Sequence, residues 1–124
     1  MLASAKIVGF LPTKDSEKAR RFYEGVLGFR FVSDDEYALV VRAGETMIRL
    51  GKAQAFTPAP YTVLGWEVPH IEAAVAELKR QGVAFEDFPF VQDRELGIWT
   101  APAGDKVAWF KDPDGNVLSV SQHK

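Results

Sequence analysis

The chain has 124 residues, no cysteine and a formal net charge of −2 at pH 7. This length suits one domain with a real hydrophobic core, and the lack of cysteine excludes disulfides, thiolate nucleophiles and sulfur metal ligands. The mixed charge pattern gives no basic surface for nucleic acid or an anionic membrane, and no apolar run approaches a membrane span. The opening MLASAKIVGFLP lacks the basic leader and cleavage site of a signal peptide, so a cytoplasmic protein is expected.

The first half of the sequence predicts a strand, a helix and three further strands. The first strand is expected over residues 7–11 and ends at Pro12. Asp15 or Ser16 can cap a helix that Gly28 ends. Further strands are expected over residues 29–33, 37–42 and 46–50. The apolar positions of the helix, which recur at helical spacing, are Ala19, Phe22, Tyr23, Val26 and Leu27.

The second half repeats this order after an Ala- and Pro-rich linker over residues 51–60. A strand is expected over residues 61–68, followed by an amphipathic helix that begins near Ile71 and ends at Gly82. The remaining strands are expected over residues 83–88, 97–101, 106–111 and 117–121. We interpret residues 1–124 as a single domain with one module over about residues 5–50 and a second over residues 61–122.

Letter matches between the halves support an internal repeat. One shift superimposes the two glycines that end the helices. A slightly larger shift places Ala-Gly-Glu of residues 43–45 on Ala-Gly-Asp of residues 103–105, and Arg49 on Trp109. The predicted fold class is therefore α+β, built from two β-α-β-β-β modules in which a helix covers one sheet face and leaves the other face free.

Two motifs carry a family resemblance. The stretch KDSEKARRFYEGVLGF, with its FY and LGF, and the later DPDGN followed by a strand resemble the vicinal oxygen chelate superfamily. That superfamily includes glyoxalase I, extradiol dioxygenases, and the fosfomycin- and bleomycin-resistance proteins. The resemblance covers essentially the whole chain and implies curved mixed sheets around a cup, with helices on the outer faces and dimerisation completing the cup. Because this fold serves both enzymes and binding proteins, the resemblance leaves the activity open.

The resemblance also implies where a metal would bind. Enzymes of the superfamily hold one divalent metal with His, Glu or Gln at four positions that face the cup. These positions fall on Val8, Arg49, Ser119 and Val63, or on Thr62 if the register of that strand slips. Valine offers no donor atom, and arginine adds a cation beside any metal. We therefore expect no metal and no cofactor, which favours a binding protein over an enzyme.

The acidic stretch DPDGN, residues 112–116, has two readings. A calcium loop needs acidic ligands at alternating positions and a distal glutamate, and the following VLSVSQHK supplies no such glutamate. Pro113 and Gly115 instead have the dihedral preferences of a tight turn between antiparallel strands. The stretch is therefore predicted to be a hairpin turn.

Strand alternation predicts which side chains line the cup. If Val8 and Ser119 face it, Trp66 has the opposite parity and lies under the second helix. Aromatic walls around a few polar groups are typical of a small-molecule pocket. Arg49 can pair with an acidic ligand group or stack on a planar ring. The predicted ligand-binding residues are Phe10, Met47, Arg49, Tyr61, Glu67, Trp99, Trp109 and Ser119.

Structural roles stay open for several of these residues. Arg49 can instead neutralise Glu67 or point to solvent, since buried charges need partners. Trp99 and Trp109 can belong to a filled core.

The histidines and Ser119 give little support to catalysis. His70 is expected to cap the second helix or to be exposed, and His123 is expected in a frayed tail. Ser119 has neither a nearby histidine in the sequence nor the glycines of a nucleophile elbow, which disfavours a serine hydrolase. Residues 34–36 are expected to form a solvated turn.

Two classes of function remain. The first is a non-metal protein that sequesters a planar or aromatic compound in a cup shared by a homodimer, similar to bleomycin-resistance proteins. Those proteins are typically strongly acidic, and a charge of −2 departs from that pattern. The alternative is a metal-dependent lyase, isomerase or dioxygenase resembling lactoylglutathione lyase, with ligands displaced by register. A third hypothesis is a degenerate scaffold whose cup is filled.

Overall fold

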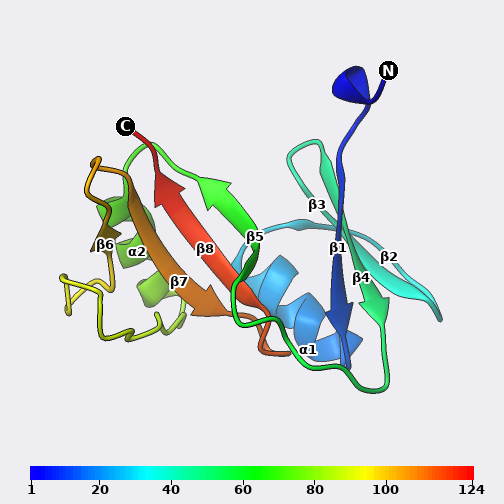
Figure 1. Ribbon diagram of the computed structural model, residues 1–124. Helices are drawn as coiled ribbons and strands as arrows, with labels where there is room; N and C mark the ends of the chain where they lie inside the picture. The colour runs from blue at the N-terminus through cyan, green and yellow to red at the C-terminus, as the bar shows by residue number, and fades with distance from the viewer. The chain divides into compact units, whose positions relative to one another are not determined.

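The computed structural model describes residues 1–124, which divide into two compact units, Met1–Thr57 and Pro58–Lys124. Each unit contains one four-stranded sheet and one principal helix (Figure 1). The strand orders are β1-β4-β3-β2 and β5-β8-β7-β6. Both units therefore have the same topology, which confirms the predicted α+β class and its two modules. No helix has the length and apolar character that a membrane span requires.

In the first unit, β1 runs parallel to β4, and β3 runs antiparallel to both β2 and β4. A short 3-10 turn, η1, precedes β1. The elements are η1 (Leu2–Ser4), β1 (Val8–Thr13), α1 (Ser16–Arg20), the π-helical segment η2 (Arg21–Val26), β2 (Arg30–Asp34), β3 (Ala38–Ala43) and β4 (Thr46–Lys52).

The first helix begins and ends where the sequence predicts. Asp15 is the N-cap, and its carboxylate accepts a hydrogen bond of 3.1 Å from the N–H of Lys18. The helix continues as η2, where the N–H of Leu27 donates to the carbonyl of Phe22 at 2.9 Å. Gly28 follows with a φ of 78°, a left-handed conformation that glycine adopts without strain.

One face of the first sheet forms the core of its unit. Ala19 and Tyr23 of the helical segment are completely buried, and α1 packs against β3. The opposite face, which carries Phe10 and Arg49, is called the open face of the first sheet. The strand residues buried on the helix side are Leu11, Leu39, Val41, Ile48 and Leu50.

The first strand extends beyond Pro12 to Thr13, so the prediction that proline ends it is wrong. β1 stands at the end of the strand order and pairs only with β4. Proline lacks an N–H for a second neighbour, but a strand at the edge of a sheet needs none.

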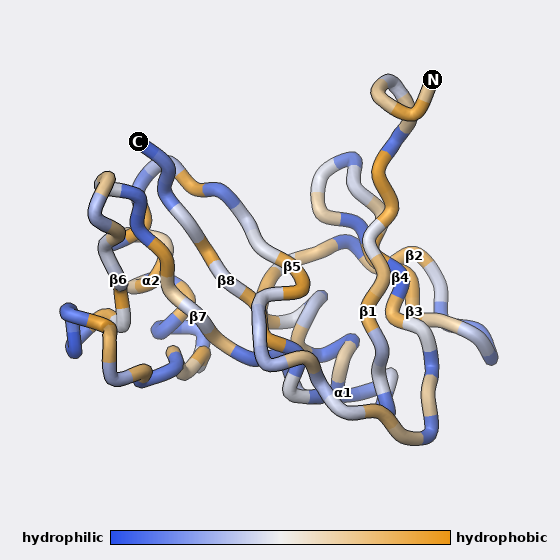
Figure 2. The backbone as a smooth tube through the Cα atoms, viewed as in Figure 1, coloured by the Kyte–Doolittle hydropathy of each residue, from blue (hydrophilic) through white to orange (hydrophobic).

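The second unit repeats the arrangement. β5 runs parallel to β8, and β7 runs antiparallel to both β6 and β8. Along β8, the sequence VLSVSQ changes between apolar and polar residues, as Figure 2 shows. The elements are β5 (Thr62–Glu67), α2 (Ile71–Arg80), β6 (Trp99–Thr100), β7 (Lys106–Lys111) and β8 (Val117–Gln122).

The second helix is capped by a residue distant in the sequence. His70 occupies the N-cap position, but its side chain makes no capping hydrogen bond. The N–H of Ile71 donates instead to the Oε1 of Gln122, at 2.9 Å. His70 is exposed, which is the second of the two alternatives expected for it. Gly82 ends the helix region with a φ of 96°.

The strand predicted over residues 83–88 is absent. Phe85 forms only an isolated bridge with Phe110, and the N–H of Glu86 donates to the carbonyl of Trp109 at 2.8 Å. The short β6 pairs with the same strand, β7, farther along. The segment at residues 85–86 and β6 thus both pair with the side of β7 that faces away from β8. Because they share this side, the strand predicted over residues 97–101 is shortened to the two residues of β6.

The predicted repeat is correct in topology but wrong in two of its letter matches. The turn at residues 43–45 joins β3 to β4, whereas the turn at residues 103–105 joins β6 to β7. β4 and β8 hold the same place in their sheets, as do β3 and β7. Arg49 lies on β4 and Trp109 on β7, so they are not counterparts. Arg49 lies instead on the strand equivalent to that of Ser119, because β4 and β8 each pair with the first strand of their unit.

The acidic stretch at residues 112–116 is the hairpin turn that the sequence predicts. The N–H of Asp112 donates to the carbonyl of Asn116, and the N–H of Gly115 donates to the carbonyl of Asp112, both at 3.0 Å. Gly115 has a φ of 86°. The turn joins the antiparallel strands β7 and β8.

Candidate functional site

An aromatic cluster, defined here as Phe88, Phe90, Trp99 and Trp109, lies on the face of the second sheet that faces away from α2. Trp109 stands opposite Ser119 in the ladder, whereas the next residue, Phe110, is completely buried on the helix side. The centroid of the Trp109 ring lies 5.6 Å from that of Phe88, 5.7 Å from that of Phe90 and 6.1 Å from that of Trp99. We call this face the open face of the second sheet.

None of the four rings belongs to the buried core. Phe88, Trp99 and Trp109 are half-buried, and Phe90 is 55% exposed. Trp66 shows the contrast, because it lies on the helix side and stacks on Phe110 with centroids 6.1 Å apart. The parity predicted for Trp66 is therefore correct, and the cluster presents aromatic surface to solvent.

The Trp109 indole is held in a fixed orientation. Its Nε1 donates a hydrogen bond of 3.1 Å to the Oγ1 of Thr62 on β5. With its polar edge satisfied, the indole offers apolar surface for stacking. Thr62 reaches this position because β5 has a bulge between Thr62 and Leu64. The register slip considered for this strand therefore occurs, and Thr62 rather than Val63 lies beside Trp109.

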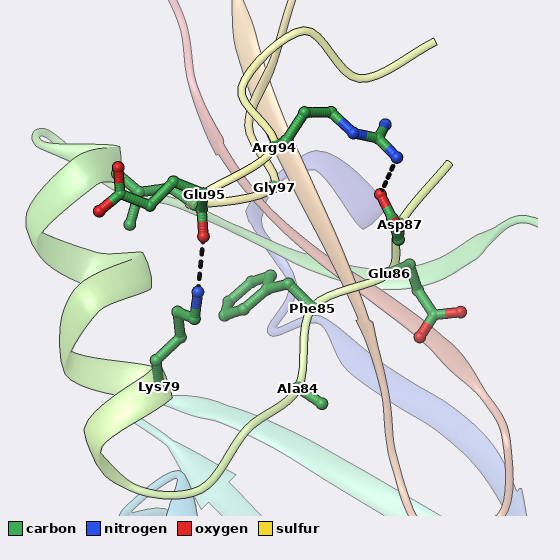
Figure 3. Close-up of a pocket in the computed structure, with 9 residues that line it drawn as sticks. Lys79, Ala84, Phe85, Glu86, Asp87, Arg94, Glu95 and Gly97 are labelled. Atoms are coloured by element: carbon green, nitrogen blue, oxygen red, sulfur yellow. Dashed lines mark hydrogen bonds and ion pairs between the residues drawn. The ribbon is translucent and has the colours of Figure 1, made fainter. Parts of the chain in front are cut away.

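Arg94 fastens the segment that carries Phe88 and Phe90. Its Nη1 donates to the carbonyl of Phe88 at 2.8 Å and to that of Val91 at 3.1 Å. Its guanidinium also pairs with Asp87 (Figure 3). These contacts help to fix a segment whose backbone pairing is limited to isolated bridges.

The side chain of Gln92 fastens the same segment at its other end. Its Nε2 donates to the carbonyl of Thr100 at 3.0 Å, and its Oε1 accepts from the N–H of Thr100 at 2.9 Å. Asp93 supplies a further turn, because its Oδ1 accepts from the N–H groups of Glu95 and Leu96. The segment is thus ordered by these side chains together with backbone hydrogen bonds, among them the bond from the N–H of Gly97 to the carbonyl of Asp93 at 2.9 Å.

A cavity of about 260 Å³ lies between the end of α2 and this segment (Figure 3). Its two cations are engaged by the protein itself. Lys79 donates to the carbonyl of Glu95 at 2.6 Å, and Arg94 pairs with Asp87. The cavity therefore offers a ligand no unpaired cation, and we assign it a structural role.

Of the other residues predicted to bind a ligand in the second unit, two lie on the open face and one does not. Ser119 lies directly opposite Trp109 and is 7% exposed. Glu67 lies on the same open face, two residues beyond the partner of Ser119 in β5. Tyr61 precedes β5 and is 67% exposed. The bulge changes the alternation, so Thr62 takes the place expected for Tyr61. The sequence analysis missed Phe88 and Phe90.

The predicted residues of the first unit gather on the open face of the first sheet. Phe10 lies directly opposite Arg49, and Met47 lies opposite Val8. Phe10 is 73% exposed, whereas Arg49 and Met47 are half-buried. Within its own unit, Arg49 makes no hydrogen bond or ion pair.

The C-terminal residues are held, contrary to the expectation of a frayed tail. His123 places Nε2 at 2.9 Å from the Oγ of Ser121 and Nδ1 at 3.5 Å from the Oδ2 of Asp105. The N–H of Lys124 donates to the other oxygen of Asp105 at 2.9 Å. The hydrogen bond from the Lys124 backbone and, after it, the one with the His123 side chain hold the pKa of Asp105 below its usual range.

The contacts that join Asp105, His123 and Ser121 are not those of a serine hydrolase, because Ser121 does not lie on a nucleophile elbow. Ser121 lies within β8, paired with strands on both sides, and its carbonyl accepts from the N–H of Val68 at 2.8 Å. A hydrolase of that type places its serine on a sharp turn between strand and helix. We therefore interpret the contacts of His123 as a clasp for the C-terminus.

Two units of β-α-β-β-β topology, each with a helix on one sheet face and an open face opposite, define the structural class. A family model of the glyoxalase/bleomycin resistance protein/dioxygenase superfamily matches residues 5–120. The chain belongs to this superfamily, as its sequence motifs predict.

Solved structures agree with this assignment. The chain is similar to a superfamily member from Sphaerobacter thermophilus, with a TM-score of 0.75 and 25% identity, covering 99% of this chain and 100% of that chain. It is also similar to TnmS3, an antibiotic binding protein from Streptomyces, with a TM-score of 0.69 and 25% identity, covering 100% and 99%. A glyoxalase family protein from Enterococcus faecalis shares the fold, with a TM-score of 0.71 and 20% identity, covering 98% and 99%.

The donor set does not fit the divalent metal of the superfamily's enzymes. No group of three or more His, Cys, Asp or Glu side chains is placed to hold a metal ion. At the four inferred positions, Val8 has no donor atom, Arg49 is a cation, and the Thr62 hydroxyl already accepts the bond from Trp109. Ser119 alone supplies an oxygen, and one hydroxyl is not a metal site.

Proposed function

We propose that this protein binds a planar aromatic compound without a metal, using the open face of the second sheet. The observation that carries the proposal is the aromatic cluster, whose rings are half-buried or exposed and whose central indole is oriented by Thr62. Rings held in this way lose little conformational freedom when a ligand stacks on them. The similarity to TnmS3, an antibiotic binding protein, supports a sequestering role.

The expected affinity is moderate. A desolvated aromatic contact contributes on the order of 1 kcal/mol beyond its buried area. Two or three such contacts, added to the area itself, support a dissociation constant in about the micromolar range. The metal-dependent lyase, isomerase or dioxygenase is disfavoured because no donor set is present. We place the protein in the cytoplasm, which cell fractionation tests.

Titration with planar aromatic compounds, including polycyclic antibiotics, tests the proposal. We expect quenching of tryptophan fluorescence by at least one of them. Trp109→Ala is expected to weaken the binding of that compound about tenfold, because it removes the central ring of the aromatic cluster. Calorimetry measures the affinity of the variant independently of its fluorescence.

The matched control is Trp66→Phe, which alters a tryptophan on the helix side. This variant is expected to bind like the wild type. If Trp109→Ala unfolds the protein, the tryptophan has a core role. If it folds and binds normally, or if no compound binds the intact protein, the proposal is wrong and the filled scaffold takes its place.

A further inference from the structure

The open face of the first sheet carries three arginines at neighbouring ladder positions. Arg30 of β2 lies directly opposite Arg42 of β3, and Arg42 lies opposite Met47 of β4. Arg49 follows Met47 by two residues on the same strand, so both side chains leave the same face. These three residues are called the arginine face.

Burial confirms which side the arginines occupy. Val41, which precedes Arg42, is completely buried on the helix side, and Ile48, which precedes Arg49, is 2% exposed. Successive side chains of a strand point to opposite faces. The arginines therefore lie away from the helix, with Arg42 and Arg49 half-buried and Arg30 exposed.

The arginine face has no carboxylate partner within its unit. The hydrogen bond from the Nη1 of Arg42 goes to the backbone carbonyl of Glu45, at 3.3 Å. Arg30 and Arg49 have no hydrogen bond or ion pair there. Other cations of the same unit are paired differently, each with a carboxylate: Arg20 with Glu24, Arg21 with Glu17, and Lys52 with Asp34.

One acid does lie within electrostatic range of this face. Asp35 has a lowered pKa, but the main causes are hydrogen bonds from the N–H groups of Ala38 and Tyr37, with Arg49 a smaller cause. The Asp35 carboxylate is thus occupied by its own turn. It does not neutralise the arginines.

This arrangement is unfavourable unless an anion binds. Like charges directly opposite each other destabilise a sheet, and a half-buried guanidinium without a partner loses hydration without compensation. Guanidinium groups bind carboxylate and sulfonate groups through paired, charge-assisted hydrogen bonds. Phe10, opposite Arg49 and 73% exposed, adds apolar surface beside the charges.

We infer that the arginine face binds the acid group of a small aromatic acid, whose ring packs against Phe10. This inference rests on the proposed function for the class of ligand, an aromatic compound, and it adds on the first unit a separate surface that selects a negatively charged member of that class. It also gives roles to Arg30 and Arg42, which the sequence analysis did not select.

Two matched probes isolate the charge. Anilinonaphthalene sulfonate is an aromatic anion that fluoresces on binding, and N-phenylnaphthylamine is the same ring system without the sulfonate. We expect the wild type to bind the anion about tenfold more tightly than the neutral probe. Added salt should weaken the anion's binding, because it screens exposed charges, and leave that of the neutral probe nearly unchanged.

Arg49→Met and Arg42→Met are each expected to weaken the binding of the anionic probe about tenfold and to leave the binding of the neutral probe unchanged. Arg30→Met, at an exposed position, is the variant least able to disturb folding and should show a smaller loss. Arg21→Met is the matched control, because Arg21 lies on η2 and pairs with Glu17. Circular dichroism checks that each variant is folded.

The outcomes separate the two claims. If both probes bind equally well, or if folded arginine variants bind the anion normally, the arginine face has no ligand role while the proposed function stands. If neither probe binds, this inference is wrong, and the proposed function then depends on the wider titration. A loss of both probes in Arg49→Met, with the fold intact, also contradicts a role specific to the acid group.

Discussion

The Asp112 carboxylate shows how an acidic residue is used by the fold itself. It accepts hydrogen bonds from the N–H groups of Asp114 and Asn116, both at 2.9 Å, and from the Asn116 side chain at 2.8 Å. Asp112 is 5% exposed and Asn116 is 2% exposed. An oxygen that orders a turn in this way is not free to coordinate an ion.

At the scale of residues, the prediction concerns the metal content of the purified protein. We expect no stoichiometric zinc, nickel, iron or manganese in protein purified without a chelator or a metal-affinity tag, because Val8, Arg49, Thr62 and Ser119 supply no ligand set. Elemental analysis of the purified chain measures this. About one tightly bound metal ion per chain, whose removal by a chelator abolishes an activity, would favour the enzyme instead.

At the scale of elements, the segment from Phe85 to Ile98 positions the candidate site without being a strand. Arg94→Met removes the donors to the Phe88 and Val91 carbonyls. We expect faster hydrogen exchange in this segment and aromatic binding weakened about fivefold, since a loosened platform must be ordered again on binding. Hydrogen exchange followed by mass spectrometry measures the first effect and calorimetry the second.

Arg80→Met is the control for this prediction. Arg80 pairs with Glu77 on the exposed side of α2 and donates nothing to the segment. It should leave both measurements unchanged. Equal exchange in wild type and Arg94→Met would mean that other contacts, such as those of Gln92, hold the segment.

Elements with local signals could be predicted from the sequence, and those that depend on distant contacts could not. Asp15, Gly28 and the DPDGN turn mark boundaries by their own chemistry, and the structure confirms them. Phe90 follows a proline in an aperiodic stretch, and its place depends on Arg94 and Gln92. The bulge at Val63 has no special residue to announce it. The predicted equivalence of Arg49 and Trp109 is wrong because it depends on aligning two Ala-Gly-acid turns, and such a turn suits any hairpin.

At the scale of the whole molecule, both open faces carry exposed apolar side chains. Phe10 on the first sheet is 73% exposed, and Phe90 of the aromatic cluster is 55% exposed. Exposed apolar patches of this kind mark binding or association surfaces. We therefore propose a two-fold homodimer in which modules of different chains complete each cup.

Light scattering at micromolar concentration should return the mass of two chains. Phe10→Ser is expected to shift the equilibrium toward the monomer, because it removes exposed apolar area from a face that we expect to line the shared cup. A monomeric wild type at this concentration would count against shared cups and would favour closure within one chain.

The most direct test of the central claim is a nitrogen–proton correlation spectrum of the three indole N–H groups during titration with a planar aromatic ligand, in buffer that contains a chelator. The chain has three tryptophans, and only Trp99 and Trp109 lie in the aromatic cluster. We predict that the indole signals of Trp99 and Trp109 shift in proportion to binding while that of Trp66 stays in place. Shifts confined to Trp66, or binding that the chelator abolishes, would contradict a metal-free aromatic site on the open face.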